Sequence, residues 1–212
     1  MTLNEILTNL LHEIGQVLLI PCMVILLILM VLTVWQLGDL LIEALMERKS
    51  HRSDGAALLL QLKGKDRRQI KSLLESWALP RSQKAALLLL VEQEGGEEEL
   101  TILAQRLLAE EEAKCASSLR PTELVVKLGP MFGLLGTLIP LGPGIVALGM
   151  GDTETLSKSM AVAFDTTIAG LVSAAVCFVI SGIRKRWYSS QMATLEALME
   201  KVIREVAEDA EG

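Results

Sequence analysis

Two threonines and one aspartate stand out because they lie inside stretches of the chain that are otherwise apolar. Thr137 and Thr167 each belong to a row of small residues, and Asp165 is the one ionisable residue between positions 159 and 183. A hydroxyl both donates and accepts hydrogen bonds, so it can pass a proton or hold an ion or a water molecule. A carboxylate within a membrane is costly and is a functional hypothesis by default. Thr166 lies between Asp165 and Thr167 in the sequence. The candidate ion-pathway residues are therefore Thr137, Thr167, Thr166 and Asp165.

Each of these residues also has a structural interpretation. A membrane threonine often bonds the carbonyl one turn earlier in its own helix. Asp165 can instead bond a neighbouring subunit or reach the external surface. At about 100° per residue, Asp165 and Thr167 are roughly 200° apart around a helix, so they are not expected to face the same groove squarely.

The stretch around Thr137 is dense in glycine and proline. Small residues let two membrane helices approach closely, and prolines free backbone carbonyls that lipid cannot satisfy. A simple membrane anchor needs neither feature, whereas a helix that lines an oligomeric pore or a moving interface does. The candidates for pore-helix packing are Gly129, Pro130, Gly133, Gly136, Pro140, Pro143 and Gly170.

The distribution of charge indicates the elements that hold these residues. Of 212 residues, 51% are hydrophobic and 22% are charged, but the charges avoid three windows. Residues 14–38 and 128–151 carry no charge, and residues 159–183 carry only Asp165. About 20 apolar residues cross a membrane as a helix. We therefore predict an all-α membrane protein with three transmembrane helices.

Basic residues set the expected orientation, because they favour the cytosolic side. Residues 39–127 carry 14 basic residues, residues 184–212 carry five, and residues 1–13 carry none. The N-terminus is therefore expected outside. The predicted order is an external segment 1–13, transmembrane helix 14–38, cytosolic helical segment 39–127, transmembrane helix 128–151, external turn 152–158, transmembrane helix 159–183, and cytosolic C-terminal helix 184–212.

The cytosolic parts are expected to be helical because they are rich in good helix formers. Pro121 suits the first turn of a helix, so a new helix is expected to begin there and lead into the second span. The tail carries an apolar stripe at steps of three and four, which favours packing either on the chain's own cytosolic helices or around an oligomer axis. Its members are Tyr188, Met192, Leu195, Met199, Val202 and Val206.

Composition and motifs exclude several classes of function. The formal net charge is -6, whereas nucleic-acid binding needs a basic face. The chain has no Walker loop, GxSxG or HExxH motif, and its two histidines have no His, Cys or acidic partner at ligand spacing. We expect no enzyme activity, no cofactor and no metal site.

Two motifs carry a resemblance to a known family. They are GPMFGLLGT at 129–137 and AFDTTIAGLVSA at 163–174. Together with the order of one span, a cytosolic segment, a two-span hairpin and a helical tail, they resemble the MotA/TolQ/ExbB proton-channel family. The similarity is greatest to the TolQ/ExbB branch, as a divergent member, since Val162 stands where ExbB-like proteins carry a glutamate.

The resemblance implies a function and a set of partners. It implies a homopentamer in the plasma (inner) membrane, around a dimer of a one-span protein of ExbD/TolR/MotB type. That partner carries an intramembrane Asp, which binds the travelling proton or sodium ion. By position, Thr137 and Thr167 match the family's threonines that line the ion path. The alternative from another class is a multispan membrane scaffold that conducts no ions.

Overall fold

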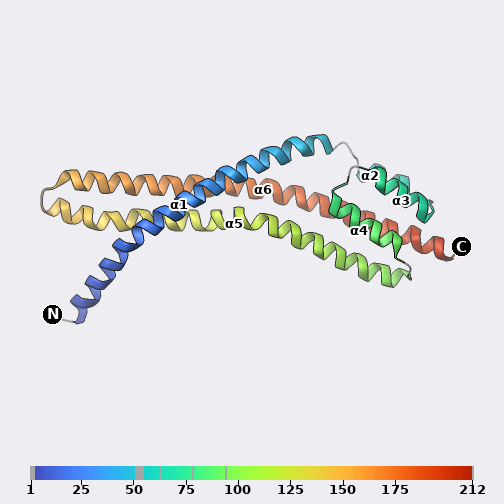
Figure 1. Cartoon of the computed structure of the whole chain (residues 1–212), viewed down its shortest axis with the longest axis horizontal. Helices are drawn as coiled ribbons and strands as arrows, with labels where there is room; N and C mark the ends of the chain where they lie inside the picture. Colours follow the sequence, from blue (N-terminus) through green and yellow to red (C-terminus); the bar gives the residue numbers. More distant parts are fainter. Residues whose placement is uncertain (1–2, 51–54, 63, 78, 94, 212) are drawn as a thin grey trace. The chain divides into compact units, whose positions relative to one another are not determined.

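The described part of the chain folds into α-helices (Figure 1). A computed structural model describes residues 3–50, 55–62, 64–77, 79–93 and 95–211, and all regular structure in these ranges is helical. The all-α prediction is thus confirmed for the described residues. The helices are α1 Leu3–Ser50, α2 Gly55–Leu62, α3 Arg67–Ser76, α4 Arg81–Glu92, α5 Glu97–Gly149 and α6 Thr153–Glu211.

Within the part of the chain that the structure describes, three helices are long and apolar enough to cross a membrane, as the three apolar windows predict. The candidate spans lie within Glu13–Leu45, Glu97–Gly149 and Thr153–Ala207. The side of the membrane on which the N-terminus lies stays a prediction from the basic residues.

The helices contribute to two compact units. Unit 1 comprises Met1–Leu40 and Arg120–Gly182, and unit 2 comprises Leu41–Leu119 and Ile183–Gly212. Unit 1 contains the three apolar windows almost completely, and unit 2 contains most of the charged residues. The division between the units therefore follows the composition of the chain.

In unit 1, a tight turn joins α5 to α6. Gly151 has a φ of 79°, which a glycine adopts without steric cost. The N–H of Asp152 donates to the Ala147 carbonyl at 2.9 Å, and that of Gly151 donates to Leu148 at 3.0 Å, which together end α5 in a Schellman motif. The reversal thus occupies residues 150–152, and α6 begins at Thr153, inside the segment 152–158 for which a turn was expected.

The start of α6 is held by Asp152. Its carboxylate accepts hydrogen bonds from the Thr155 hydroxyl at 2.6 Å and from the Thr155 N–H at 3.0 Å. These bonds favour the ionised form, and the hydroxyl contributes most to lowering the pKa of Asp152. The sequence therefore places a C-cap glycine and an N-cap carboxylate side by side to make the hairpin.

The expected start of a new helix at Pro121 is wrong. Helix α5 runs without a break from Glu97 to Gly149 and contains Pro121, Pro130, Pro140 and Pro143. A proline inside a helix costs about 3 kcal/mol because it removes one backbone hydrogen bond. Thr122, the next residue, and Val125, one helical turn after Pro121, are both completely buried. Packing of this segment offsets the local cost, so the helix continues through the proline.

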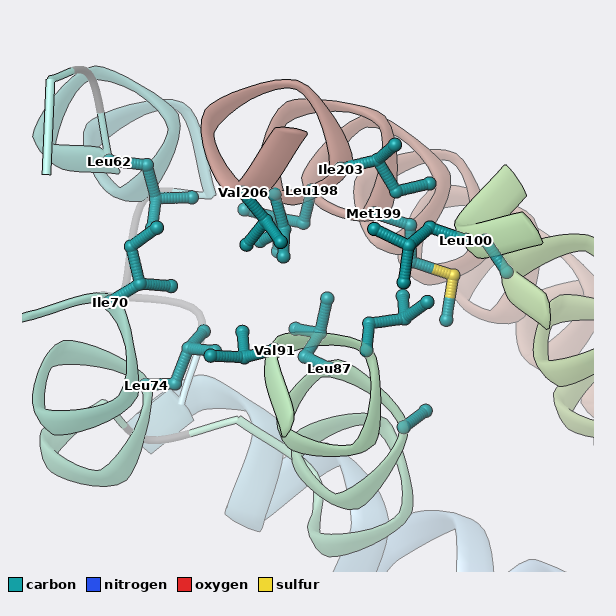
Figure 2. Packing of buried hydrophobic residues seen from close by; sticks show 14 of the residues in the cluster. Leu62, Ile70, Leu74, Leu87, Val91, Leu100, Leu198, Met199, Ile203 and Val206 are labelled. Atoms are coloured by element: carbon teal, nitrogen blue, oxygen red, sulfur yellow. The ribbon is translucent and has the colours of Figure 1, made fainter. Parts of the chain in front are cut away.

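Unit 2 is built around an apolar core to which five helices contribute (Figure 2). Leu62 of α2, Ile70 and Leu74 of α3, and Leu87 of α4 are all fully buried. The tail's stripe enters the same core, since Leu195, Met199, Val202 and Val206 are buried there. Packing of the tail on the chain's own helices, one of the two interpretations of the stripe, is thereby confirmed.

A buried carboxylate links the tail to the turn after α2. Glu205 is only 7% exposed, and its Oε2 accepts a hydrogen bond from the Gly64 N–H at 2.7 Å. Its Oε1 pairs with Lys201 at 2.5 Å. A buried charge is tolerated only when it is paired and hydrogen-bonded in this way.

A second polar cluster joins the three long helices within unit 2. The Arg184 guanidinium is 6% exposed and pairs with Glu43 at 3.0 Å. The Tyr188 hydroxyl lies 3.4 Å from the same carboxylate and 3.2 Å from the Ser118 hydroxyl. Burial is the main cause that raises the pKa of Tyr188, so this phenol stays protonated at neutral pH.

We predict that Arg184→Gln destabilises unit 2 because it leaves the Glu43 carboxylate half-buried without its charge partner. The expected loss is about 2 kcal/mol, less than for a fully buried pair because Glu43 keeps some contact with water. Denaturant unfolding of the purified protein in detergent, followed by circular dichroism, measures the change.

Arg106→Gln is the matched control. It also removes an arginine from an ion pair, with Glu110, but that pair is exposed at 77% and 52%, and exposed pairs contribute little. Equal effects of the two substitutions on the unfolding midpoint would contradict the role given to the Glu43–Arg184 pair.

Candidate functional site

Helices α5 and α6 approach each other until their backbones touch. A Cβ atom added to Gly129 would lie 2.6 Å from the carbonyl oxygen of Gly170, and one added to Gly170 would collide with the carbonyl of Gly129. One added to Gly133 would meet the backbone of α6 at 3.4 Å. Such an approach is available only to residues without a side chain, which is the physical reason for the GxxxG spacing.

The rest of the contact is made by small residues placed opposite one another. A Cβ on Gly136 would lie 2.6 Å from the Thr166 side chain, and one on Gly144 would lie 3.0 Å from Ser159. Small residues of α5 thus face small residues of α6 over most of the apolar length. The two rows of small residues predicted from the sequence do meet.

The prolines of α5 lie at different places on this surface. Pro140 is buried, Pro143 is half-buried, and Pro130 is exposed. Pro140 follows Gly136 by one helical turn and therefore belongs to the row that faces α6.

Thr137 and Thr167 are both half-buried, and each hydroxyl donates to a backbone carbonyl. Thr137 donates to Leu134 at 2.7 Å. Thr167 donates to Ala163 at 3.1 Å and lies 3.5 Å from the carbonyl of Gly133 on the facing helix. Each oxygen keeps its lone pairs, so each threonine remains able to accept a hydrogen bond or to ligate a cation.

Thr166 is placed differently from the other two threonines. It is 8% exposed, it packs on Gly136, and its hydroxyl donates to Val162 at 2.9 Å and to Ala163 at 3.0 Å. Thr166 is therefore a packing residue of the helix contact in this structure.

Helix α1 covers one flank of the hairpin. Leu29 of α1 forms a buried cluster with Val125 of α5 and Cys177 of α6, and Phe132 packs against it. The Cys22 thiol donates to the Phe132 carbonyl at 3.3 Å. We call this side of the hairpin the α1 flank.

Polar contacts hold the same flank farther along α1. The Thr33 hydroxyl donates to Leu29 at 2.8 Å and accepts from the Cys177 thiol at 3.6 Å. Thr33 is not among the residues predicted from the sequence, although its hydroxyl lies inside the uncharged window 14–38 and could have indicated it.

Asp165 lies on the α1 flank. It lines a groove together with Val162 of α6 and with residues of α1 from Met23 to Met30, and its side chain is exposed. Thr167 is about 200° around α6 from Asp165, and Thr137 is about 140° around α5 from Phe132. The two threonines therefore lie on the opposite side of the hairpin, which we call the threonine flank.

The described residues hold no cluster of three or more His, Cys, Asp or Glu side chains that would suit a metal ion. Of the candidate residues, the Thr137 and Thr167 hydroxyls lie on the threonine flank and the Asp165 carboxylate lies on the α1 flank.

A comparison with protein-family models matches residues 79–197 to the MotA/TolQ/ExbB proton channel family. This match covers more than half of the chain. The chain belongs to the MotA/TolQ/ExbB proton channel family. The match includes both the Gly129–Thr137 motif and the whole of 163–174, so the contacting rows of α5 and α6 are part of it. No curated protein matches the chain at a significant level.

Membership of this family agrees with the three apolar helices and makes the chain a membrane protein of proton-channel type. The assignment to the TolQ/ExbB branch stays a prediction from the two motifs. The same holds for the roles of the individual residues of unit 1.

We predict that Gly129→Ala separates α5 from α6, because the new methyl group would meet a backbone oxygen that cannot move aside. Overpacking of this kind costs about 1–3 kcal/mol. Thermal unfolding in detergent, followed by circular dichroism, should show a lower midpoint.

Gly142→Ala is the control, since a Cβ there meets nothing within 4 Å. It should leave the midpoint unchanged or raise it, because alanine favours a helix over glycine by up to about 1 kcal/mol. If both substitutions raised the midpoint alike, the close contact would be refuted.

Proposed function

We propose that this protein is the ion-conducting stator subunit of a motor driven by a proton- or sodium-motive force. Five copies would surround the transmembrane helices of a one-span partner of ExbD/TolR/MotB type, in the plasma membrane with the N-terminus outside. The observation that supports this most directly is the threonine flank, where two hydroxyls lie at the edge of a backbone-to-backbone helix contact.

The threonine flank suits an ion path because it is the side of the hairpin that α1 leaves free. The Thr137 and Thr167 hydroxyls already donate to carbonyls of their own helices. Their lone pairs can therefore accept from a protonated carboxyl group or ligate a sodium ion. By rotating away from its carbonyl, the same hydroxyl can donate to an ionised carboxylate.

These two states of the hydroxyl match the two states of the partner's Asp. In an apolar environment an ionised carboxylate needs a donor, whereas a neutral carboxyl group needs an acceptor. A row of threonines supplies both and carries no charge of its own. The ion can then bind to and leave the partner's Asp, and the Asp is not held at one subunit by an opposite charge.

The rigid contact of α5 and α6 supports the mechanical part of the proposal. A pore helix held to its neighbour at Gly129 and Gly170 can transmit force without the two helices sliding apart. The proposed motor work needs no covalent chemistry from this chain, in keeping with the expectation that it is not an enzyme. The driven process is then set by the partner's external domain.

We predict that Thr167→Val lowers ion flux through the assembled complex. Valine keeps the shape but removes the hydroxyl. An unmet polar group in an apolar site costs about 1–3 kcal/mol, which corresponds to a loss of about 5- to 150-fold in rate. Flux is measured with a pH- or sodium-sensitive dye in vesicles that contain the chain and its one-span partner.

Thr167→Ser is the matched variant, since it keeps the hydroxyl and should keep most of the flux. Unchanged flux in Thr167→Val, with the complex still assembled, would remove Thr167 from the ion path. Absence of flux in every variant and in the wild type would favour the non-conducting scaffold instead.

A further inference from the structure

The groove on the α1 flank has one charged residue in an apolar surrounding. Its volume is about 290 Å³, and its walls are residues of α1 from Met23 to Met30 and residues of α6 from Val162 to Ala169. Apart from Asp165 and the hydroxyl of Thr166, the lining side chains are apolar. Asp165 is 12 residues from the start of α6 at Thr153, about 18 Å along the helix.

No basic group within the described part of unit 1 is placed to neutralise Asp165. The window 14–38 of α1 and the window 128–151 carry no charge at all. On α6 the nearest basic residue is Lys158, seven residues earlier, and it pairs with Glu154 at 2.7 Å. A carboxylate in such a place is unfavourable until another molecule supplies a positive charge.

The adjoining half of α1 is also uncovered. From Ile6 to Ile20, none of the described side chains is buried, and Leu11, Val17 and Ile20 are each at least 70% exposed. Only from Cys22 onward does α1 bury side chains against the hairpin. A helix lying in the groove could therefore continue along α1 without displacing any described part of unit 1.

We infer that the groove receives a transmembrane helix of a second protein, which carries one Lys or Arg at the depth of Asp165. A neighbouring copy of this chain does not fit, because its own apolar windows contain no basic residue. A helix with an intramembrane Asp, as proposed for the threonine flank, does not fit either, because like charges repel. A pair of opposite charges between apolar helix faces attracts the second helix and also fixes its position along the membrane normal.

This site rests on the same membrane placement as the proposed function but not on ion conduction, because it lies on the opposite flank. The test uses designed one-span helices of about 20 leucine and alanine residues, with either Lys or Leu at the depth of Asp165. Their association with the full-length chain in its assembled complex is measured by energy transfer in vesicles.

The Lys helix should bind about tenfold more tightly than the Leu helix, as expected for one hydrogen-bonded charge pair between membrane helices. Asp165→Asn should abolish the difference, and Asp165→Lys should transfer the preference to a helix that carries Asp. Leu27→Trp keeps the charge of Asp165 but fills the groove, so it should weaken the binding of both the Lys helix and the Leu helix. Thr167→Val, on the other flank, should leave binding of the Lys helix unchanged, whatever it does to flux.

Equal binding of the Lys and Leu helices to the wild-type chain would overturn the inference. So would cross-linking of Leu27→Cys to a second copy of this chain in the assembled complex, since the groove would then be an interface between copies. If Asp165→Asn bound the Lys helix as well as the wild type does, charge pairing at Asp165 would be excluded.

Discussion

The contact of two helix backbones at Gly129 and Gly170 is the constraint on which the rest of unit 1 depends. It allows α5 and α6 to lie so close that Gly136 meets the Thr166 side chain. It also fixes the rotation of each helix about its axis, since only one face of each helix has side chains small enough for such a close contact. That rotation decides which residues lie beside α1 and which lie opposite, so the position of every polar group in the hairpin follows from it.

The fixed rotation gives the hairpin two chemically different flanks. One carries neutral hydroxyls that donate and accept, and the other carries a single carboxylate next to apolar residues of α1. A neutral, two-way hydrogen-bonding surface suits a mobile ion, because it binds the ion weakly in either state. An isolated charge suits a stationary partner, because pairing then holds that partner at one depth. The proposed ion path and the proposed second partner thus rest on different residues.

Much of this arrangement can be predicted from the sequence. The apolar windows predict three membrane helices, and the spacing of Gly129 and Gly133 predicts a close helix contact, because both signals lie in the local sequence. The 200° between Asp165 and Thr167 predicts that they face different sides. The continuity of α5 through Pro121 is not predictable in this way, because it depends on tertiary packing of Thr122 and Val125. The side of the hairpin on which α1 packs is likewise not predictable, because it depends on long-range contacts such as that of Cys22 with Phe132.

The most direct test of the account is the water accessibility of the two flanks in the assembled complex. Single cysteines at positions 137, 167 and 169, in a chain whose native cysteines are replaced by serine or alanine, are treated with a charged thiol reagent in vesicles. The account predicts modification at 137 and 167, where the ion path runs, and protection at 169, in the groove of the α1 flank. Modification at 169 with protection at 137 and 167 would contradict it.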